Sequence, residues 1–180
     1  MRESEIGGLT CSVARTIGVI GDGWTLLLIK ELFLRTRRFE EFQALTGMSP
    51  RLLTARLAKL EENGVVVREP YESKRPRYEY RLTARGLALH SVVIMMGQWG
   101  NDWIQPKDEV ERPLQLNHKA CGHELEIVPT CKCCGEAVGP KDVSVTIGSA
   151  MEAQRTVMRN EFREAVNRKS AGDLEDDLSP

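Results

Sequence analysis

The most informative stretch of this 180-residue chain is SPRLLTARLAKLEENG, residues 49–64. Ser49 is a favoured N-cap residue, and the proline after it suits the first position of a helix. Three leucines follow at helical spacing, at positions 53, 57 and 60, and Asn63-Gly64 is typical of a helix end. The stretch therefore predicts a capped amphipathic helix that ends near Glu62. Its polar face carries Arg51, Thr54, Ala55 and Lys59.

The sequence before this helix predicts three more helices. Apolar residues at helical spacing indicate one over residues 11–20, and a segment that is apolar nearly all round indicates a buried helix over residues 24–34. A short helix follows over residues 39–45, with Gly47 after its end. We expect its inward face to hold Phe39, Phe42 and Leu45.

The sequence after the capped helix predicts a hairpin and a long helix. Residues 65–69 are rich in β-branched side chains. In residues 77–82 charged side chains alternate with tyrosine and leucine, and a polar connector joins the two segments. Thr83 is the expected N-cap of a helix from Ala84 to about Ile104. This order of elements is that of a winged helix-turn-helix, a mainly helical α+β fold.

Such a fold directs the N-terminus of the capped helix toward DNA. Its unpaired backbone N–H groups and positive dipole end suit phosphates and base edges. Arg51 and Thr54 lie three residues apart, on the face that reads bases in a major groove. The candidates for phosphate contact are Arg37, Arg38, Arg56 and Lys59, and the cap residue Ser49 belongs to the same interface. At the hairpin tip we expect Lys74, Arg75 and Arg77 to reach either the backbone or the minor groove.

The same pattern also describes a plain surface helix, in which Arg56 pairs with Glu40 or Glu41. The net charge of -1 gives no sign of a nucleic-acid partner. Charge is distributed unevenly, however: residues 30–85 hold 13 Lys and Arg against 8 Asp and Glu, whereas residues 106–180 hold 10 against 14. This asymmetry favours contact with a polyanion through the first half of the chain.

The motifs of residues 11–103 resemble those of the HxlR-type regulators, a branch of the MarR-like winged-helix proteins. The resemblance rests on CSVARTIGVIGDGWTLLLIKEL (11–32), RFEEF (38–42), residues 49–64, YEYRLTARG (78–86) and QWG (98–100). It implies a homodimeric transcriptional regulator that binds a pseudo-palindromic site on double-stranded DNA. It also implies that the first and last helices of the domain form the dimer contact. An apolar excess in residues 92–103 agrees with that contact.

Cys11 has two interpretations. In some members of the family a cysteine at this place senses electrophiles or oxidants, and Cys11 lies at a predicted helix start with Arg15 one turn on. The alternative is a small, half-buried packing residue. The sequence leaves open whether this thiol or a small-molecule effector controls DNA binding.

The second half of the chain contains a candidate metal site. His118-Lys-Ala-Cys121-Gly122 and Cys131-Lys-Cys-Cys134-Gly135 both have the spacing of a zinc knuckle, and together they would make a structural Cys₃His zinc site. His123 is an alternative to His118, and Cys133 is a spare thiol. The competing interpretation is a pair of turns whose cysteines are merely small and buried.

We therefore divide the chain into three parts. Residues 1–105 form the winged helix-turn-helix and dimerisation domain, residues 106–148 a linker and the Cys/His element, and residues 149–180 an amphipathic helix over 151–168 with a disordered acidic tail.

The sequence also excludes several classes of function. No apolar run reaches the roughly 18–20 residues of a membrane span, and the N-terminus lacks the apolar core of a signal peptide, so we expect a cytoplasmic protein. No catalytic motif is recognisable, so we expect no enzyme. The rival hypothesis is a zinc-stabilised protein-interaction module that does not bind DNA directly.

Overall fold

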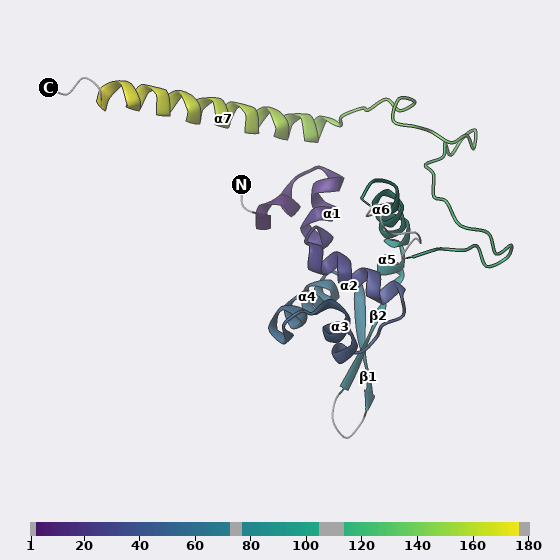
Figure 1. Ribbon diagram of the computed structural model, residues 1–180. Coiled ribbons are helices and arrows are strands. Elements are labelled where there is room, and N and C mark those ends of the chain that lie inside the picture. The colour runs from purple at the N-terminus through teal and green to yellow at the C-terminus, as the bar shows by residue number, and fades with distance from the viewer. Residues whose placement is uncertain (1–2, 73–76, 105–113, 177–180) are drawn as a thin grey trace. The chain divides into compact units, whose positions relative to one another are not determined.

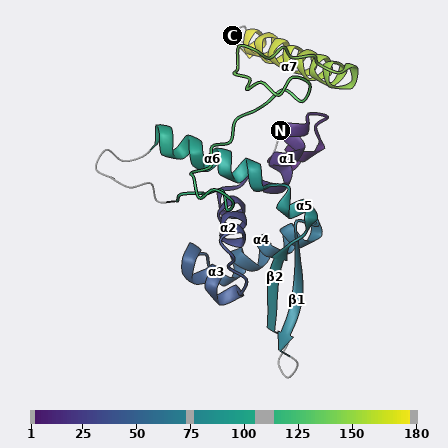
Figure 2. The same cartoon turned by 90° about the vertical axis from the view of Figure 1, so that its right-hand side faces the viewer.

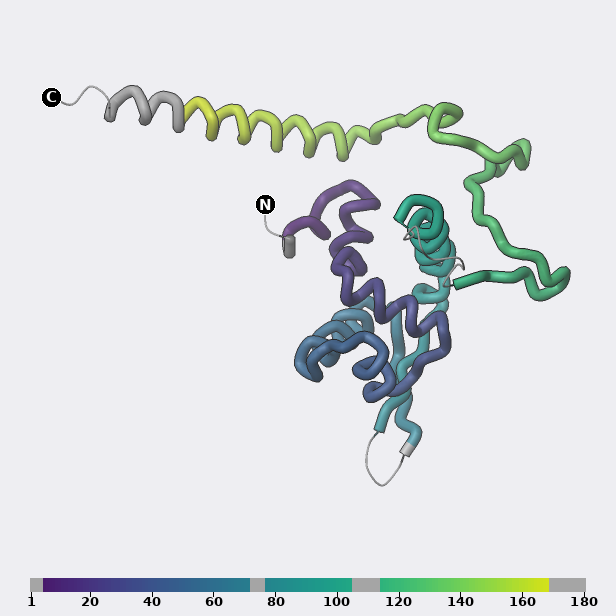
Figure 3. Tube along the Cα trace, in the orientation of Figure 1, coloured from purple at the N-terminus to yellow at the C-terminus, as the bar shows by residue number. Residues whose placement is uncertain are grey.

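The computed structural model describes residues 3–72, 77–104 and 114–176 of the chain (Figures 1 and 3). The chain divides into two units, which we describe separately. The larger unit is Val19–Asp142, and the smaller combines Met1–Gly18 with Val143–Pro180.

The larger unit has the element order that the sequence predicts. The end of α1 (Ser12–Ile20) leads into it. The other elements are α2 (Gly23–Phe33), α3 (Phe39–Thr46), α4 (Pro50–Glu62), β1 (Val66–Glu72), β2 (Arg77–Leu82), α5 (Ala84–Leu87) and α6 (His90–Trp103). In Figures 1 and 2, α3 and α4 lie beside α2, and the β1–β2 hairpin extends beyond them. This arrangement is a winged helix-turn-helix.

The core of this unit lies between α2, α3, α4 and β1. The three leucines of α4 are buried, as the sequence predicts. Phe42 of α3 is fully buried, but Leu45 is 61% exposed, so the prediction of an inward Leu45 was wrong. Leu45 lies one residue before the end of α3, where little packs against it. The buried cluster comprises Ile20, Leu28, Ile29, Leu32, Phe42, Met48, Leu53, Leu57, Leu60, Val65 and Val66.

The hairpin is joined to the helices before it by backbone contacts. Strands β1 and β2 pair antiparallel from Val66–Leu82 outward, with an irregularity between Pro70 and Glu72. An isolated bridge pairs Arg38 with Glu79, and the Tyr80 N–H donates to the Arg37 carbonyl over 2.8 Å. The β1–β2 hairpin, which is the wing of the fold, is therefore held against the start of α3.

The long helix predicted over residues 84–104 is broken. Helix α5 ends at Leu87, and α6 begins at His90. At the break the Leu89 N–H donates to the Gly86 carbonyl, three residues back, which makes a tighter turn than the α-helix. This turn packs Leu89 against the core, and burial of that side chain favours the bend.

The smaller unit contains η1 (Glu3–Gly8), most of α1 and α7 (Ser149–Asp176). The Thr10 backbone N–H and hydroxyl both donate to Gln154 Oε1, over 2.9 and 2.8 Å. Helix α7 begins before the predicted position 151 and continues to Asp176, through residues that we expected to be disordered. Apolar side chains on α7, Phe162 among them, are exposed.

Within the described residues, no single helix has the length and hydropathy needed to cross a membrane. Helices α1 and α2 meet that requirement only as a pair, and a bend of 79° separates them.

Candidate nucleic-acid interface

Helix α4 begins with an open N-terminal turn. Gly47 ends α3 in the left-handed conformation (φ 70°), which a residue with a side chain rarely adopts, and so turns the chain toward α4. Ser49 caps α4 by accepting a hydrogen bond from the Leu52 N–H over 3.3 Å. Pro50 occupies the first helical position. This is the capped start that the sequence predicts.

Arg51 and Thr54 are exposed on this first part of α4. Neither side chain makes a hydrogen bond or ion pair within the part of the chain that the structure describes. They lie three residues apart, so they share one face of the helix. A guanidinium and a hydroxyl are thus presented together beside the positive end of the helix dipole.

Arg56, the next arginine on α4, makes an internal contact. Its Nε lies 3.0 Å from Asp22 Oδ1, and its side chain is half-buried. The sequence suggested Glu40 or Glu41 as alternative partners, and the structure places Asp22 there. Lys59 is also half-buried, and its charge acts on the same carboxylate. Arg56 therefore ties α4 to the start of α2.

Asp22 is the N-cap of α2 and the anchor of this contact. Its carboxylate accepts hydrogen bonds from the Thr25 N–H, over 3.0 Å, and from the Thr25 hydroxyl. Burial raises the pKa of Asp22, but these hydrogen bonds and the charges of Arg56 and Lys59 outweigh burial, so the pKa lies below its ordinary value of 3.8. Sequence reasoning missed this residue, although an aspartate just before an apolar helix is itself an N-cap signal.

We expect Asp22→Ala to lower the free energy of unfolding by about 1–2 kcal/mol at pH 7, because it removes the cap and the partner of Arg56. The folded pKa is depressed, so this stabilisation is complete above the unfolded pKa of about 4 and is lost as the pH falls through the folded value. Urea denaturation at pH 7 and at about pH 3 measures the difference.

The matched control for this change is Asp22→Asn, which keeps a capping side chain and removes only the charge. It should cost less than Asp22→Ala at pH 7. A deficit for Asp22→Ala that does not shrink between the two pH values would show that the carboxylate charge contributes nothing.

Arg37 turns inward. Its Nη1 donates to the carbonyls of Leu32, over 2.8 Å, and Thr36, over 3.1 Å, at the end of α2. Burial, with the charges of Arg81 and Arg35 nearby, lowers the pKa of the Arg37 guanidinium. These bonds satisfy the last carbonyls of a helix. In this structure Arg37 closes α2, and the expectation that it contacts phosphate stays a prediction.

Arg38 is exposed beside the middle of the wing. Its Nε lies 3.5 Å from Glu79 Oε1, and its guanidinium lies over the Tyr71 ring, 4.8 Å from the centroid. Such a weak, exposed ion pair can exchange for a phosphate at little cost. Arg77 is exposed at the start of β2. Lys74 and Arg75 lie outside the described residues.

Cys11 lies directly before α1 and is half-buried. Its carbonyl accepts from the Arg15 N–H over 3.0 Å, the first bond of that helix. The helix start that the sequence predicts is thus present, and Arg15 lies one turn on.

The Cys/His segment, residues 116–138, forms two separate turns. His118 Nδ1 lies 3.3 Å from Cys121 Sγ. In the second turn the N–H groups of Cys134 and Cys133, together with the Cys134 thiol, hydrogen-bond to Cys131 and lower its pKa. Within the described ranges, no three His, Cys, Asp or Glu side chains come together as a metal site. A turn forms at each of the two predicted places, and the two turns are not joined into one site.

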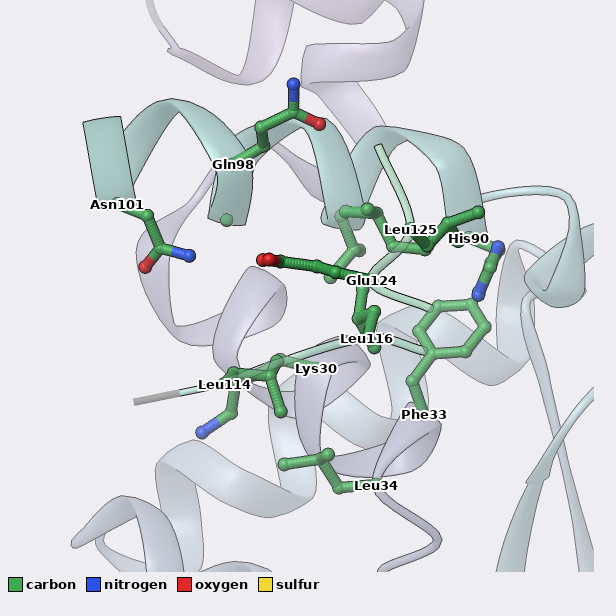
Figure 4. A pocket seen from close by; sticks show the side chains of 13 residues that line it. Lys30, Phe33, Leu34, His90, Gln98, Asn101, Leu114, Leu116, Glu124 and Leu125 are labelled. Carbon is green, nitrogen blue, oxygen red and sulfur yellow. The ribbon is translucent and has the colours of Figure 1, made fainter. Parts of the chain in front are cut away.

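A cavity of about 170 Å³ lies between α2, α6 and the start of the Cys/His segment (Figure 4). Phe33 and His90 meet edge to face at one end, 5.4 Å apart. The Glu124 side chain extends into the cavity on the side of Asn101 (Figure 4). The cavity thus combines an apolar lining with polar groups at one side, which is typical of a small-molecule site. Sequence reasoning did not find it, since its walls come from three distant segments.

Known proteins share both the sequence and the fold of this chain. The model of the HxlR-like helix-turn-helix family matches residues 19–108. The uncharacterized HTH-type transcriptional regulator Rv3095 of Mycobacterium tuberculosis is 34% identical over 143 residues, which is 79% of this chain and 89% of that protein. The uncharacterized HTH-type transcriptional regulator YdeP of Bacillus subtilis is 36% identical over 110 residues, 61% of this chain and 86% of that protein.

Two solved structures are similar to this chain over more than its winged-helix part. PA1607, described as a candidate transcription factor, is 35% identical with a TM-score of 0.69, over 77% of this chain and 96% of its own. A candidate transcription factor of Pseudomonas aeruginosa, PA1374, is 28% identical with a TM-score of 0.54, over 78% of this chain and 94% of its own. This chain therefore belongs to the HxlR-like helix-turn-helix family, and it is a transcriptional regulator of the helix-turn-helix type.

Proposed function

We propose that this regulator binds double-stranded DNA as a homodimer, with the first turn of α4 in the major groove and the β1–β2 wing along the backbone. The observation that carries the proposal is the contrast on α4. Arg56 is engaged with Asp22, whereas Arg51 and Thr54 are exposed together at the N-terminus of the helix. An arginine in this position can make a bidentate contact with guanine.

An apolar stripe on α6 supports the homodimer. Its members recur every three or four residues along one face of the helix, and each is at least two-fifths exposed. They are Val92, Met95, Met96, Trp99 and Trp103. A stripe of this kind on a soluble protein is typical of an interface. A symmetric dimer would present two copies of α4, and hence read a pseudo-palindromic site.

The direct test is fluorescence anisotropy of the full-length protein on the DNA upstream of its own gene, across a salt series. We expect tight binding that weakens steeply with salt, because phosphate contacts release counterions. Arg51→Ala should weaken binding by about tenfold to hundredfold, the worth of one bidentate base contact. Arg75→Ala should reduce the salt slope by about one. Sedimentation of the same samples should show a dimer.

The matched control is Arg159→Ala, which removes the same charge from α7, where Arg159 pairs with Glu152 over 3.7 Å. It should bind as the wild type does. If Arg51→Ala also binds as the wild type does, α4 does not read DNA in this way. Absence of salt-dependent binding would favour the protein-interaction module.

Two mechanisms could control DNA binding by this regulator: a small-molecule effector and a reactive thiol. The cavity between α2 and α6 is the site that a small-molecule effector would occupy, because it adjoins the proposed dimer helix. Thiol control would act through Cys11. Diamide should then abolish DNA binding, and dithiothreitol should restore it. If the Cys11→Ser variant keeps its DNA binding in diamide, the thiol control is assigned to Cys11.

A further inference from the structure

The Cys/His segment contains one backbone structure twice, thirteen residues apart. Each copy is a hairpin turn closed by one isolated β-bridge and three backbone hydrogen bonds, and each has a glycine with positive φ (73° and 75°) at the same place. The bridges are Asn117–Glu124 and Thr130–Ala137. The bonds, donor first, are His118–His123, Gly122–His118 and Leu125–Leu116 in one turn, and Cys131–Glu136, Gly135–Cys131 and Val138–Pro129 in the other.

This equivalence assigns the ligands. His118 occupies the place of Cys131, and Cys121 occupies the place of Cys134. His123, the alternative histidine, corresponds to Glu136 across the hairpin, and Cys133 corresponds to Ala120. The choice between the two histidines, which the sequence left open, thus falls on His118. Cys133 remains outside the set.

The first turn brings its two ligands together, and the second turn has the same backbone form. The His118 ring nitrogen and the Cys121 sulfur are 3.3 Å apart. In the second turn, the Gly135 N–H donates to the Cys131 carbonyl over 2.8 Å, as the Gly122 N–H donates to the His118 carbonyl over 2.7 Å in the first turn. The Cys134 thiol contacts Glu136 Oε2 over 3.7 Å. A hairpin turn that carries two ligands three residues apart, followed by a glycine, is the geometry of half a zinc site.

The alternative that these cysteines pack a small core does not fit their burial. Cys121, Cys133 and Cys134 are exposed, and Cys131 is half-buried. Exposed thiols gain nothing from packing. The equivalent places of Cys121 and Cys134 in the two hairpins therefore require another explanation, and metal binding supplies one.

We propose that one Zn²⁺ joins the two turns through His118, Cys121, Cys131 and Cys134. Zinc in structural sites takes four tetrahedral ligands, and each turn supplies two. The connection between the turns is nine residues, 122–130, which can span roughly 30 Å when extended, so its length permits both turns to reach one ion. Four protein ligands leave no open position, so the site is structural and not catalytic.

The zinc site would act on the winged-helix unit through the connection between the turns. The Ile127 N–H donates to Gln98 Oε1 on α6 over 3.1 Å. Leu116 and Leu125, which flank the first turn, line the cavity against α2 and α6. Metal binding thus orders one wall of that cavity and the segment that is fastened to the proposed dimer helix. This role does not depend on DNA binding.

Cobalt substitution of the full-length protein tests the proposal. Metal-free protein is titrated with Co²⁺ and then with Zn²⁺, and the visible spectrum is recorded. We expect saturation at one ion per chain, the intense visible bands of tetrahedral cobalt with a thiolate charge-transfer band, and displacement by zinc. Cys131→Ser and His118→Ala should lose the tetrahedral spectrum.

The chain offers matched controls for each ligand. Cys133→Ser lies in the same turn as Cys131, and His123→Ala lies in the same turn as His118; both should keep the wild-type spectrum. A pale octahedral spectrum from the wild type would overturn the proposal, as would loss of the spectrum in Cys133→Ser or His123→Ala. Metal affinity that rises with protein concentration would show that two chains share the ion, and would overturn the intrachain site.

Discussion

Phe42→Ala is expected to lower the free energy of unfolding by about 3–5 kcal/mol, the usual cost of removing a fully buried phenyl ring. Phe42 is 0% exposed and belongs to the cluster between α2, α4 and β1. Its ring also meets Tyr80 of the wing edge to face, 6.2 Å between centroids. The substitution therefore removes a side-chain contact between α3 and the wing, in addition to core packing against α2 and α4.

The measurement is chemical denaturation of the purified variant, followed by DNA binding at a temperature where it is still folded. Leu45→Ala is the matched control, because it shortens an apolar side chain on the same helix that is 61% exposed. We expect Leu45→Ala to change stability by less than about 1 kcal/mol. Equal losses for the two variants would contradict the burial that the structure assigns to α3.

Gly86→Ala is expected to cost at least about 2 kcal/mol, against the usual preference for alanine in a helix. A Cβ on Gly86 would lie 2.2 Å from the Val65 carbonyl oxygen and 2.9 Å from Leu82 Cδ2. The first of these is a backbone atom, so the strand or the helix must move. Thr83 fastens the same junction, because its hydroxyl donates to the Gly64 carbonyl over 2.6 Å.

This substitution strains the link from the wing to α6. Thermal and urea unfolding report the cost. Gly23→Ala, at the first position of α2, makes the same chemical change where a Cβ meets nothing within 4 Å. It should leave stability within about 1 kcal/mol of the wild type. A Gly86→Ala variant as stable as Gly23→Ala would show that the close approach of α5 to Val65 does not exist.

Most of the fold could be predicted because its signals are local. The cap at Ser49, the leucine spacing of α4 and the alternation of residues 77–82 each depend on neighbours within a few positions, and these elements form where expected. The break between α5 and α6 could not be predicted. It depends on Leu89 packing against a core that is assembled from distant segments.

The candidate site divides in the same way. Helical spacing places Arg51 and Thr54 on one exposed face. Spacing cannot tell which arginines are engaged with other parts of the protein. Arg37 donates to a backbone carbonyl at the end of the preceding helix. Arg56 pairs with Asp22, which lies far from it in the sequence. A guanidinium is long enough to reach either solvent or a buried acceptor, and only the fold determines which is near.

The sequence alone determined the order of the elements, the family, the start of α4 and the two turns of the Cys/His segment, because capping, periodicity and turn chemistry act over short stretches of chain. Only the tertiary structure decided that Asp22 holds Arg56, that Leu45 is exposed, and that His118 and not His123 is the equivalent of Cys131. These outcomes depend on which distant groups come within a few ångströms, and burial and hydrogen-bond pairing in the assembled fold set those distances.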